Sequence, residues 1–334
     1  MATLNPEPIL QEAVGDGLGV AHCDTLGLLA VSVMDNTLRV FASPRLGKDL
    51  DYLYSLGGDT MQFRFGDVVA RSGCLAFTGP ASARYLVVTD AGQDAVHVID
   101  VVCATHVGYV AAPNSIVGPR GVAARNSLVA VSAHRGRGDH IIQLFEGGGA
   151  TWTPVRVLGG GFGLADGQLH GPWGLRFADD DDLAVIVVAD MCNRRVSMFR
   201  VSDGSFVRHV ALNIPYPVDV EEFDNGWLVG TAVVLPFCMY VVGNGRTTKT
   251  LESAQGSCAC LATVRNVGLV VCRHATVRNV GLVEREGRVQ VFATYDAIGM
   301  AAMSVERVQW MATVARGILQ SCMHHTCSHP GWRH

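Results

Sequence analysis

The chain has 334 residues, of which 49% are hydrophobic and 17% are charged, so it can build a large core and does not have the composition of a disordered protein. Its formal net charge of −4 disfavours nucleic-acid binding, which depends mainly on a concentrated basic surface. The N-terminus lacks a basic segment followed by an apolar one, and no apolar run approaches the ~18 residues of a membrane span. We therefore expect neither a secretory signal nor a membrane protein.

The number and distribution of cysteines indicate the cellular compartment of the protein. Ten cysteines are scattered from Cys23 to Cys327. In a chain of this size without a secretory signal, we interpret them as reduced thiols, many of them buried as small apolar side chains. We therefore expect an intracellular, cytoplasmic protein.

A pattern of short strands repeats along the chain. The most apolar strand of each unit is a β-branched run bounded by turn residues. These runs span residues 28–33, 85–90, 128–133, 183–190, 227–234 and 267–271. After a polar turn, each unit continues with a strand that ends in a large apolar residue. These residues are Phe41, Ile99, Phe145, Phe199, Val241 and Phe292, which recur every 42 to 58 positions.

Another strand precedes each pair and often begins with Gly or Pro. These strands span residues 17–21, 73–77, 118–124, 171–177, 216–223 and 258–264. In one unit, a fourth strand within residues 200–210 follows across an Asp203-Gly204 hairpin turn. Six units of four antiparallel strands predict an all-β, six-bladed β-propeller, in which neighbouring blades bury both faces of each sheet. A seventh blade would need its strands within residues 43–65, where we expect one connecting strand and a loop.

The unit of residues 171–206 carries a specific polar signature. Its members are Gly171, Pro172, Gly174, Asp190, Asn193, Arg194 and Phe199. This pattern resembles the NHL repeat, a β-propeller unit in which Pro-x-Gly opens the first strand and Asp ends the second. The other units keep the apolar skeleton alone, so the resemblance covers residues 14–292 in architecture and one unit in its motif. About 13 residues precede the first unit, so we expect a stand-alone NHL protein without RING or B-box modules.

The chain divides into four expected segments. Residues 1–13 form an N-terminal segment, in which residues 7–13 could add a strand to the last blade. Residues 14–294 form the propeller. Residues 295–320 change to a helical spacing of apolar residues and predict an amphipathic helix that covers a face or rim of the propeller, or alternatively binds a partner. Residues 321–334 are expected to be a flexible tail.

The tail concentrates thiol and imidazole groups, which are ligands that zinc prefers. They are Cys322, His324, His325, Cys327 and His329. Structural zinc sites usually join two separated ligand pairs, whereas these residues lie close together at a chain end. We therefore expect no physiological metal site there.

Catalysis by a metal ion is an alternative, because several six-bladed propeller enzymes hold metal ions with side chains of their inner strands. The carboxylates on a predicted inner strand are Asp219, Glu221 and Glu222 in the fifth unit. No other inner strand offers a carboxylate or histidine in register. We therefore expect no catalytic residues and no cofactor, and keep a metal-dependent hydrolase or lyase as an alternative.

A binding scaffold needs no catalytic group and fits a near-neutral surface. We predict a monomeric, non-catalytic protein-interaction scaffold that binds protein or peptide partners through the loop faces of the propeller. The expected binding residues are Arg120, Arg135, Arg137, Trp173, Arg176, Arg194 and Arg195. RNA binding through an arginine-rich face is an alternative that the net charge disfavours.

The stretch of residues 189–199, ADMCNRRVSMF, gathers an acid, a thiol, an amide and two guanidiniums. We interpret it as the turn of a blade, with Asp190 ending one strand and residues 194–199 forming the next. Short polar side chains hydrogen-bond the backbone at such turns and tolerate positive φ, which accounts for Asp190 and Asn193. The two arginines are then expected at the surface.

Overall fold

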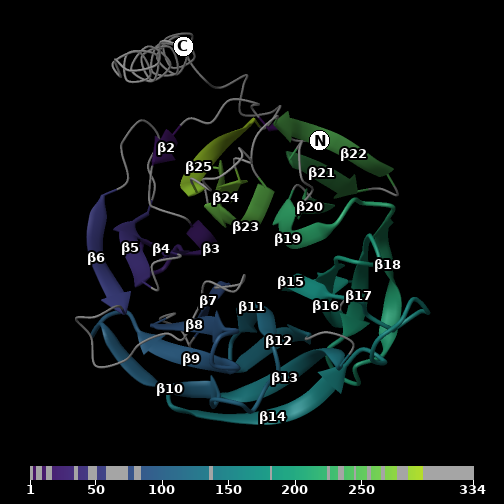
Figure 1. Ribbon diagram of the computed structural model, residues 1–334, viewed down its shortest axis with the longest axis horizontal. Helices are drawn as coiled ribbons and strands as arrows, with labels where there is room; N and C mark the ends of the chain where they lie inside the picture. The colour runs from purple at the N-terminus through teal and green to yellow at the C-terminus, as the bar shows by residue number, and fades with distance from the viewer. Residues whose placement is uncertain are drawn as a thin grey trace, which may run out of the picture.

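The structure is a computed structural model. It describes residues 3–4, 10–12, 17–33, 37–43, 51–57, 74–78, 84–134, 138–180, 183–223, 226–231, 237–243, 246–253, 257–264, 268–276 and 285–295. Five four-stranded antiparallel sheets stand as blades around a central channel (Figure 1). No described segment forms a helix long and apolar enough to cross a membrane.

Within each blade, the strands follow one another from the channel outward in chain order (Figure 1). The innermost strands are β3 (Gly17–Cys23), β7 (Leu75–Thr78), β11 (Pro119–Arg125), β15 (Pro172–Asp180) and β19 (Pro217–Phe223). The second strands are β4 (Leu28–Val33), β8 (Tyr85–Asp90), β12 (Leu128–His134), β16 (Leu183–Asp190) and β20 (Gly226–Thr231). The third strands are β5 (Thr37–Ala42), β9 (Ala95–Asp100), β13 (His140–Gly148), β17 (Arg195–Arg200) and β21 (Phe237–Gly243). The outer strands are β6 (Tyr52–Gly57), β10 (Thr105–Ala111), β14 (Thr151–Leu158), β18 (Phe206–Leu212) and β22 (Arg246–Ser253).

A further sheet contains strands from both ends of the sequence. Its strands are β23 (Ser257–Val264), β24 (Gly268–Thr276), β25 (Arg285–Tyr295), β1 (Thr3–Leu4) and β2 (Leu10–Glu12). Both N-terminal strands pair antiparallel with β25, with Thr3 opposite Tyr295 and Leu10 opposite Val291. This sheet thus links the N-terminal segment to the strand that ends the described chain.

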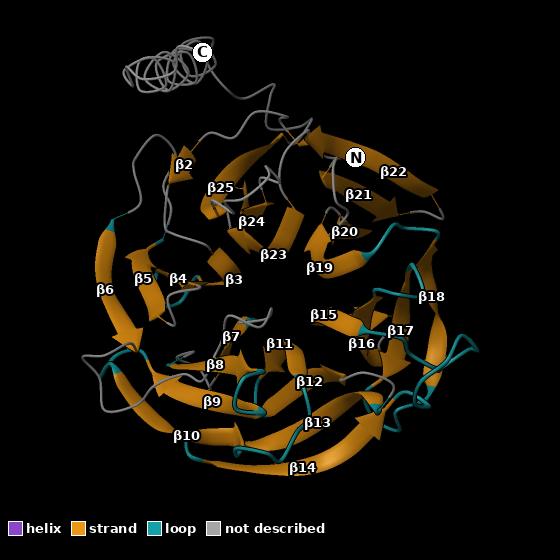
Figure 2. Ribbon diagram, viewed as in Figure 1, coloured by secondary structure: helices purple, strands orange, loops and turns teal. Residues whose placement is uncertain are grey.

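The prediction of an all-β propeller with four-stranded antiparallel blades is confirmed. The described part of the chain contains strands and loops (Figure 2). The outer strands, which the sequence indicated in one blade, occur in all five. Their apolar pattern is weaker because one side of an outer strand faces solvent; β14, for example, is mostly exposed. Residues 296–334, which hold most of the predicted helix and the whole Cys/His tail, lie outside the described residues.

Apolar side chains fill the space between neighbouring blades. Between the third and fourth blades, Ile142 and Leu144 of β13 belong to one cluster with Ile186 of β16 and Phe199 of β17, and each of these side chains is at most 2% exposed. Full burial of one such side chain contributes roughly 1.5–3 kcal/mol. Because the inner strands of each blade are covered on both faces, their sequences are continuous runs of apolar residues rather than alternations of apolar and polar ones.

The innermost strands approach one another most closely where they begin. A Cβ atom on Gly121 of β11 would lie 2.2 Å from the carbonyl oxygen of Trp173 on β15. Between these strands, the Ser132 hydroxyl accepts a hydrogen bond from the Gly121 N–H at 2.8 Å and donates to the Trp173 carbonyl at 2.5 Å. Glycine is therefore required at the third position of Pro-x-Gly because the backbone of the next blade occupies the side-chain space.

We predict that Gly121→Ala destabilises the protein, because the backbone of β15 must shift to make room. The free energy of unfolding should fall by about 1–3 kcal/mol, measured by urea denaturation. Gly148→Ala is the matched control, since a Cβ there meets nothing within 4 Å. Equal stability of the two variants would show that the blades tolerate a wider separation.

Candidate functional site

A row of aromatic and basic side chains crosses the boundary between the third and fourth blades. We call it the aromatic ribbon. It consists of Arg120, His134, His140, Phe162, His170 and Trp173. These residues meet because innermost strands begin, and second strands end, on the same face of the ring. We call this the entry face; Phe162 and His170 reach it from the loop of residues 159–171, which precedes β15.

The ribbon is continuous. The guanidinium carbon of Arg120 lies 5.2 Å from the ring centre of Trp173. The Trp173 ring is 5.8 Å from that of His134, which stacks on His140 at 5.5 Å. His140 lies 5.0 Å from Phe162. Cation–π and aromatic contacts of this kind contribute roughly 0.5–1.5 kcal/mol each, so the row is a packed surface rather than a set of separate side chains.

Backbone partners decide which nitrogen of two imidazoles carries the proton. The Nδ1 of His134 lies 3.2 Å from the carbonyl oxygen of Pro172, which can only accept, so the neutral ring is protonated at Nδ1. The N–H of Gly171 donates to Nδ1 of His140 at 2.7 Å, so that ring is protonated at Nε2. In both rings Nδ1 is therefore engaged by the backbone, and Arg120 carries the permanent charge of the ribbon.

Burial and positive neighbours keep His134 neutral at physiological pH. Burial lowers its pKa, and Arg120, His140 and His170 lower it further, to about 4. The Pro172 carbonyl acts in the opposite direction. Of these side chains, Arg120 carries a permanent positive charge.

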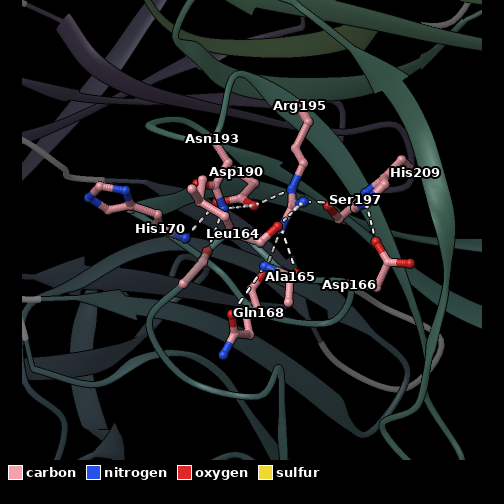
Figure 3. Close-up of polar contacts among 12 residues, drawn as sticks. Leu164, Ala165, Asp166, Gln168, His170, Asp190, Asn193, Arg195, Ser197 and His209 are labelled. Atoms are coloured by element: carbon pink, nitrogen blue, oxygen red, sulfur yellow. Dashed lines mark hydrogen bonds and ion pairs between the residues drawn. The ribbon is translucent and has the colours of Figure 1, made fainter.

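Arg195 holds the loop of residues 159–171 against the fourth blade (Figure 3). Its guanidinium donates to the carbonyl oxygens of Leu164 at 2.9 Å, Ala165 at 3.2 Å and Gln168 at 2.7 Å. Asn193 adds a hydrogen bond to the carbonyl oxygen of Gly163 at 2.9 Å. The loop is thus tied at four carbonyls, although Phe162 and Leu164 are 45% and 73% exposed.

Asp190, at the end of β16, anchors this network (Figure 3). Its carboxylate accepts hydrogen bonds from the backbone of His170 at 2.7 Å, from Asn193 at 2.7 Å and from Nε of Arg195 at 2.8 Å. Burial raises the pKa of this carboxyl, and the three donors act in the opposite direction. The Asp and Asn of the NHL-like signature therefore position the loop as well as the turn.

The turn itself differs from the sequence prediction. Arg194, rather than Asp190 or Asn193, has the positive φ, at 54°. The third strand begins at Arg195, one residue later than expected. Arg195 is 7% exposed, so the expectation of a surface guanidinium at this position is wrong, while Arg194 is exposed. The buried carboxylate of Asp190 draws the arginine side chain inward.

The other expected binding residues are divided between two places. Arg120 and Trp173 meet in the ribbon. Arg176 lies in the central channel, where its Nε donates to Glu221 at 2.5 Å and its Nη2 is 3.6 Å from Asp219. Arg135 and Arg137 lie outside the described residues. The structure thus brings two of the seven residues into direct contact.

Two carboxylates of the channel, Asp219 and Glu221, pair with Arg176. Asp219 and Glu221 line up on β19 as expected, but the guanidinium of Arg176 occupies the position between them. Glu222 is exposed. Within the described ranges, no group of three or more His, Cys, Asp or Glu side chains could hold a metal ion. The tail ligands from Cys322 to His329 lie beyond these ranges.

Ser197, His209 and Asp166 have the connectivity of a catalytic triad. The Ser197 hydroxyl is 3.1 Å from Nδ1 of His209, whose Nε2 is 3.0 Å from Asp166. However, Ser197 is 1% exposed between strands, so no substrate reaches its oxygen. The neighbouring thiol of Cys192 is also a poor nucleophile, because burial raises its pKa.

Sequence analysis did not identify four of the six ribbon residues: His134, His140, Phe162 and His170. One signal was present. His134 ends its second strand at the position where Asp90 and Asp190 end theirs.

The fold is that of a β-propeller, and its entry face carries the aromatic ribbon. No family model matches the sequence, and no curated protein matches it. A chain in a crystal structure of a nidogen/laminin complex is similar, with a TM-score of 0.50 and 11% identity over 70% of this chain and 79% of that chain. It is one of 837 solved chains that match, so the similarity establishes the fold and not a function.

We predict that Arg195→Met lowers the free energy of unfolding by about 3–5 kcal/mol, because it leaves the carboxylate of Asp190 buried without its ion pair. Urea denaturation measures the change. Arg194→Met removes the neighbouring exposed guanidinium and should change stability by less than about 0.5 kcal/mol. Similar losses in both variants would contradict the distinction between a structural and a surface arginine.

Stability should also fall in mild acid. Burial is the largest cause that lowers the pKa of His134 and of His106 to about 4, below the ~6.5 of an unfolded histidine. Between these values the unfolded chain binds more protons, so stability is fully present above pH ~6.5 and declines as the pH falls toward ~4. His134→Gln should flatten the decline by up to about 1.4 kcal/mol per pH unit. An unchanged slope in urea titrations at several pH values would contradict this assignment.

Proposed function

We propose that the protein is a non-catalytic interaction scaffold whose binding surface is the aromatic ribbon together with the loop of residues 159–171. The observation that carries this proposal is the exposure of Phe162 and Leu164 on a loop that Arg195 and Asn193 hold in place. Exposed apolar side chains on a rigid support are typical of protein-binding surfaces. The nidogen/laminin structure offers a precedent in which a protein of similar fold occurs in a protein complex.

The proposal includes the architecture of the ring. We assign the sheet of β23, β24 and β25 as a sixth blade, whose outer strand is supplied by residues 3–4 and 10–12. The pairing of both N-terminal strands with β25 supports this assignment. Closure by the N-terminus fits a six-bladed ring, and the Asp190–Asn193 turn supports membership in the NHL group. Such a ring would act as a monomer.

An intracellular, cytoplasmic location is part of the same proposal. Five cysteines support it, because the structure shows them as free thiols. They are Cys23, Cys74, Cys103, Cys192 and Cys238. Cys103 is exposed, which suits a reducing compartment better than an oxidising one.

Nothing in the structure favours the RNA or metal-enzyme alternatives over a protein scaffold. Two of the arginines expected to form a basic face, Arg176 and Arg195, are engaged with Asp219, Glu221 and Asp190. Their charges are compensated within the protein. A surface that binds RNA needs accessible, uncompensated cations.

Affinity capture with matched face variants tests the scaffold proposal. The variant Phe162→Ser with Leu164→Ser removes the exposed apolar side chains of the entry face. Val102→Ser removes a side chain that is 64% exposed on the opposite face, in the turn between β9 and β10. We expect the first variant to lose most specific partners, the second to retain them, and RNase to have no effect.

Two outcomes would overturn the proposal. Identical partners for both variants would show that the entry face does not bind them. Loss of all partners on RNase treatment would indicate an RNA-binding protein.

A further inference from the structure

We propose that the aromatic ribbon recognises an acidic peptide segment, with a carboxylate of the partner bound at Arg120 and an apolar side chain bound at Phe162 and Leu164. This inference rests on the proposed scaffold function and names the chemistry of the partner. It concerns one surface, which the third and fourth blades build together.

The first argument is charge. Arg120 carries a permanent positive charge at the channel end of the ribbon, where it lies over the Trp173 ring. Arg120 is also the neighbour that, after burial, does most to lower the pKa of His134, so its charge acts on the ribbon itself. A carboxylate is the complementary group.

The second argument is shape. Beyond His140, the ribbon ends in Phe162, and Leu164 follows two residues later on the same loop. Both side chains are large, apolar and exposed. A ligand that fits the whole ribbon therefore has an anion at one end and an apolar group at the other.

The contacts also limit the spacing of these two groups. Arg120 is joined to Phe162 through Trp173, His134 and His140, a path of at most about 21 Å. An extended chain advances up to ~3.5 Å per residue, so a separation of about six positions is enough for one extended peptide to reach both ends of the ribbon.

The third argument is rigidity. The hydrogen bonds of Arg195 to three carbonyls of the loop keep Phe162 and Leu164 at a constant position relative to Arg120. A surface that is ordered before binding loses less conformational entropy when a flexible peptide docks. Arg195 is therefore a positioning residue for this site.

A peptide fits better than a nucleic acid. The entry face carries the exposed carboxylates of Asp139, next to β13, and Asp166, on the loop of residues 159–171. These acids repel a continuous phosphate backbone, whereas a peptide with one carboxylate can avoid them. The net charge of −4 acts in the same direction.

An array of synthetic twelve-residue peptides tests the inference. Each peptide carries one Glu and one Phe, Leu or Trp at separations of one to eight residues in a Gly-Ser background. A matched array has Lys in place of Glu. We expect the full-length protein to bind the acidic series, including peptides with a separation of about six, and not the basic series.

Variants assign the binding to the ribbon. Arg120→Gln should weaken the best acidic peptide about tenfold or more, since hydrogen bonds to charged groups contribute roughly 1.5–3 kcal/mol. Arg120→Lys should restore part of the affinity. Arg194→Gln is the matched control, because it removes an exposed guanidinium from the turn of the neighbouring blade. Circular dichroism confirms that each variant is folded.

The outcomes separate this inference from the scaffold proposal. Binding of the Lys series, equal binding by Arg120→Gln and the unchanged protein, or tighter binding of a twelve-residue oligouridine would each overturn the acidic-peptide inference. So would the absence of peptide binding. If capture of partners through Phe162 and Leu164 nevertheless persists, the scaffold stands and the class of partner is wrong; if that capture also fails, both proposals fall.

Discussion

Packing of blade against blade is the constraint on which the rest of this structure depends. The inner strands of each blade are buried on both faces. The backbones of neighbouring innermost strands therefore come so close that Gly121 has no room for a Cβ beside Trp173. The Ser132 hydroxyl bridges the two strands at this point. Because the interior is filled in this way, variation is confined to the loops and strand ends at the two faces of the ring, and the aromatic ribbon lies there.

The last residue of the second strand has different roles in different blades. In the fourth blade Asp190 pairs with Arg195, which holds a loop on the entry face. In the second blade Asp90 lies 3.3 Å from His97, so an imidazole takes the place of the guanidinium. In the third blade the position is itself a histidine, His134, and it becomes part of the ribbon. The same backbone site thus contributes to stability in two blades and to a surface in the third.

Much of the fold could be read from the sequence because strand and turn signals are local. The apolar runs predicted the inner strands of the five blades, and the Asp203-Gly204 turn indicated the outer strand of one blade. The other outer strands were not predicted, because they lack an apolar pattern. Of the site, Arg120 and Trp173 were expected at a face, whereas the histidines were not. The position of His134 at the end of a second strand is a signal only once the blades are aligned with one another, and His140 and His170 have no such signal.

The sequence by itself determined the class of fold, the repeat and the approximate positions of the turns, because hydrophobic periodicity and turn chemistry act over a few neighbouring residues. Only the tertiary structure decided what the arginines do. Arg194 and Arg195 are adjacent and chemically identical, yet one is exposed and the other is buried against Asp190. Which arginine is buried depends on the alternation of side chains along the strand and on the position of a loop some 30 residues earlier in the chain. That loop takes its position only when the blades pack.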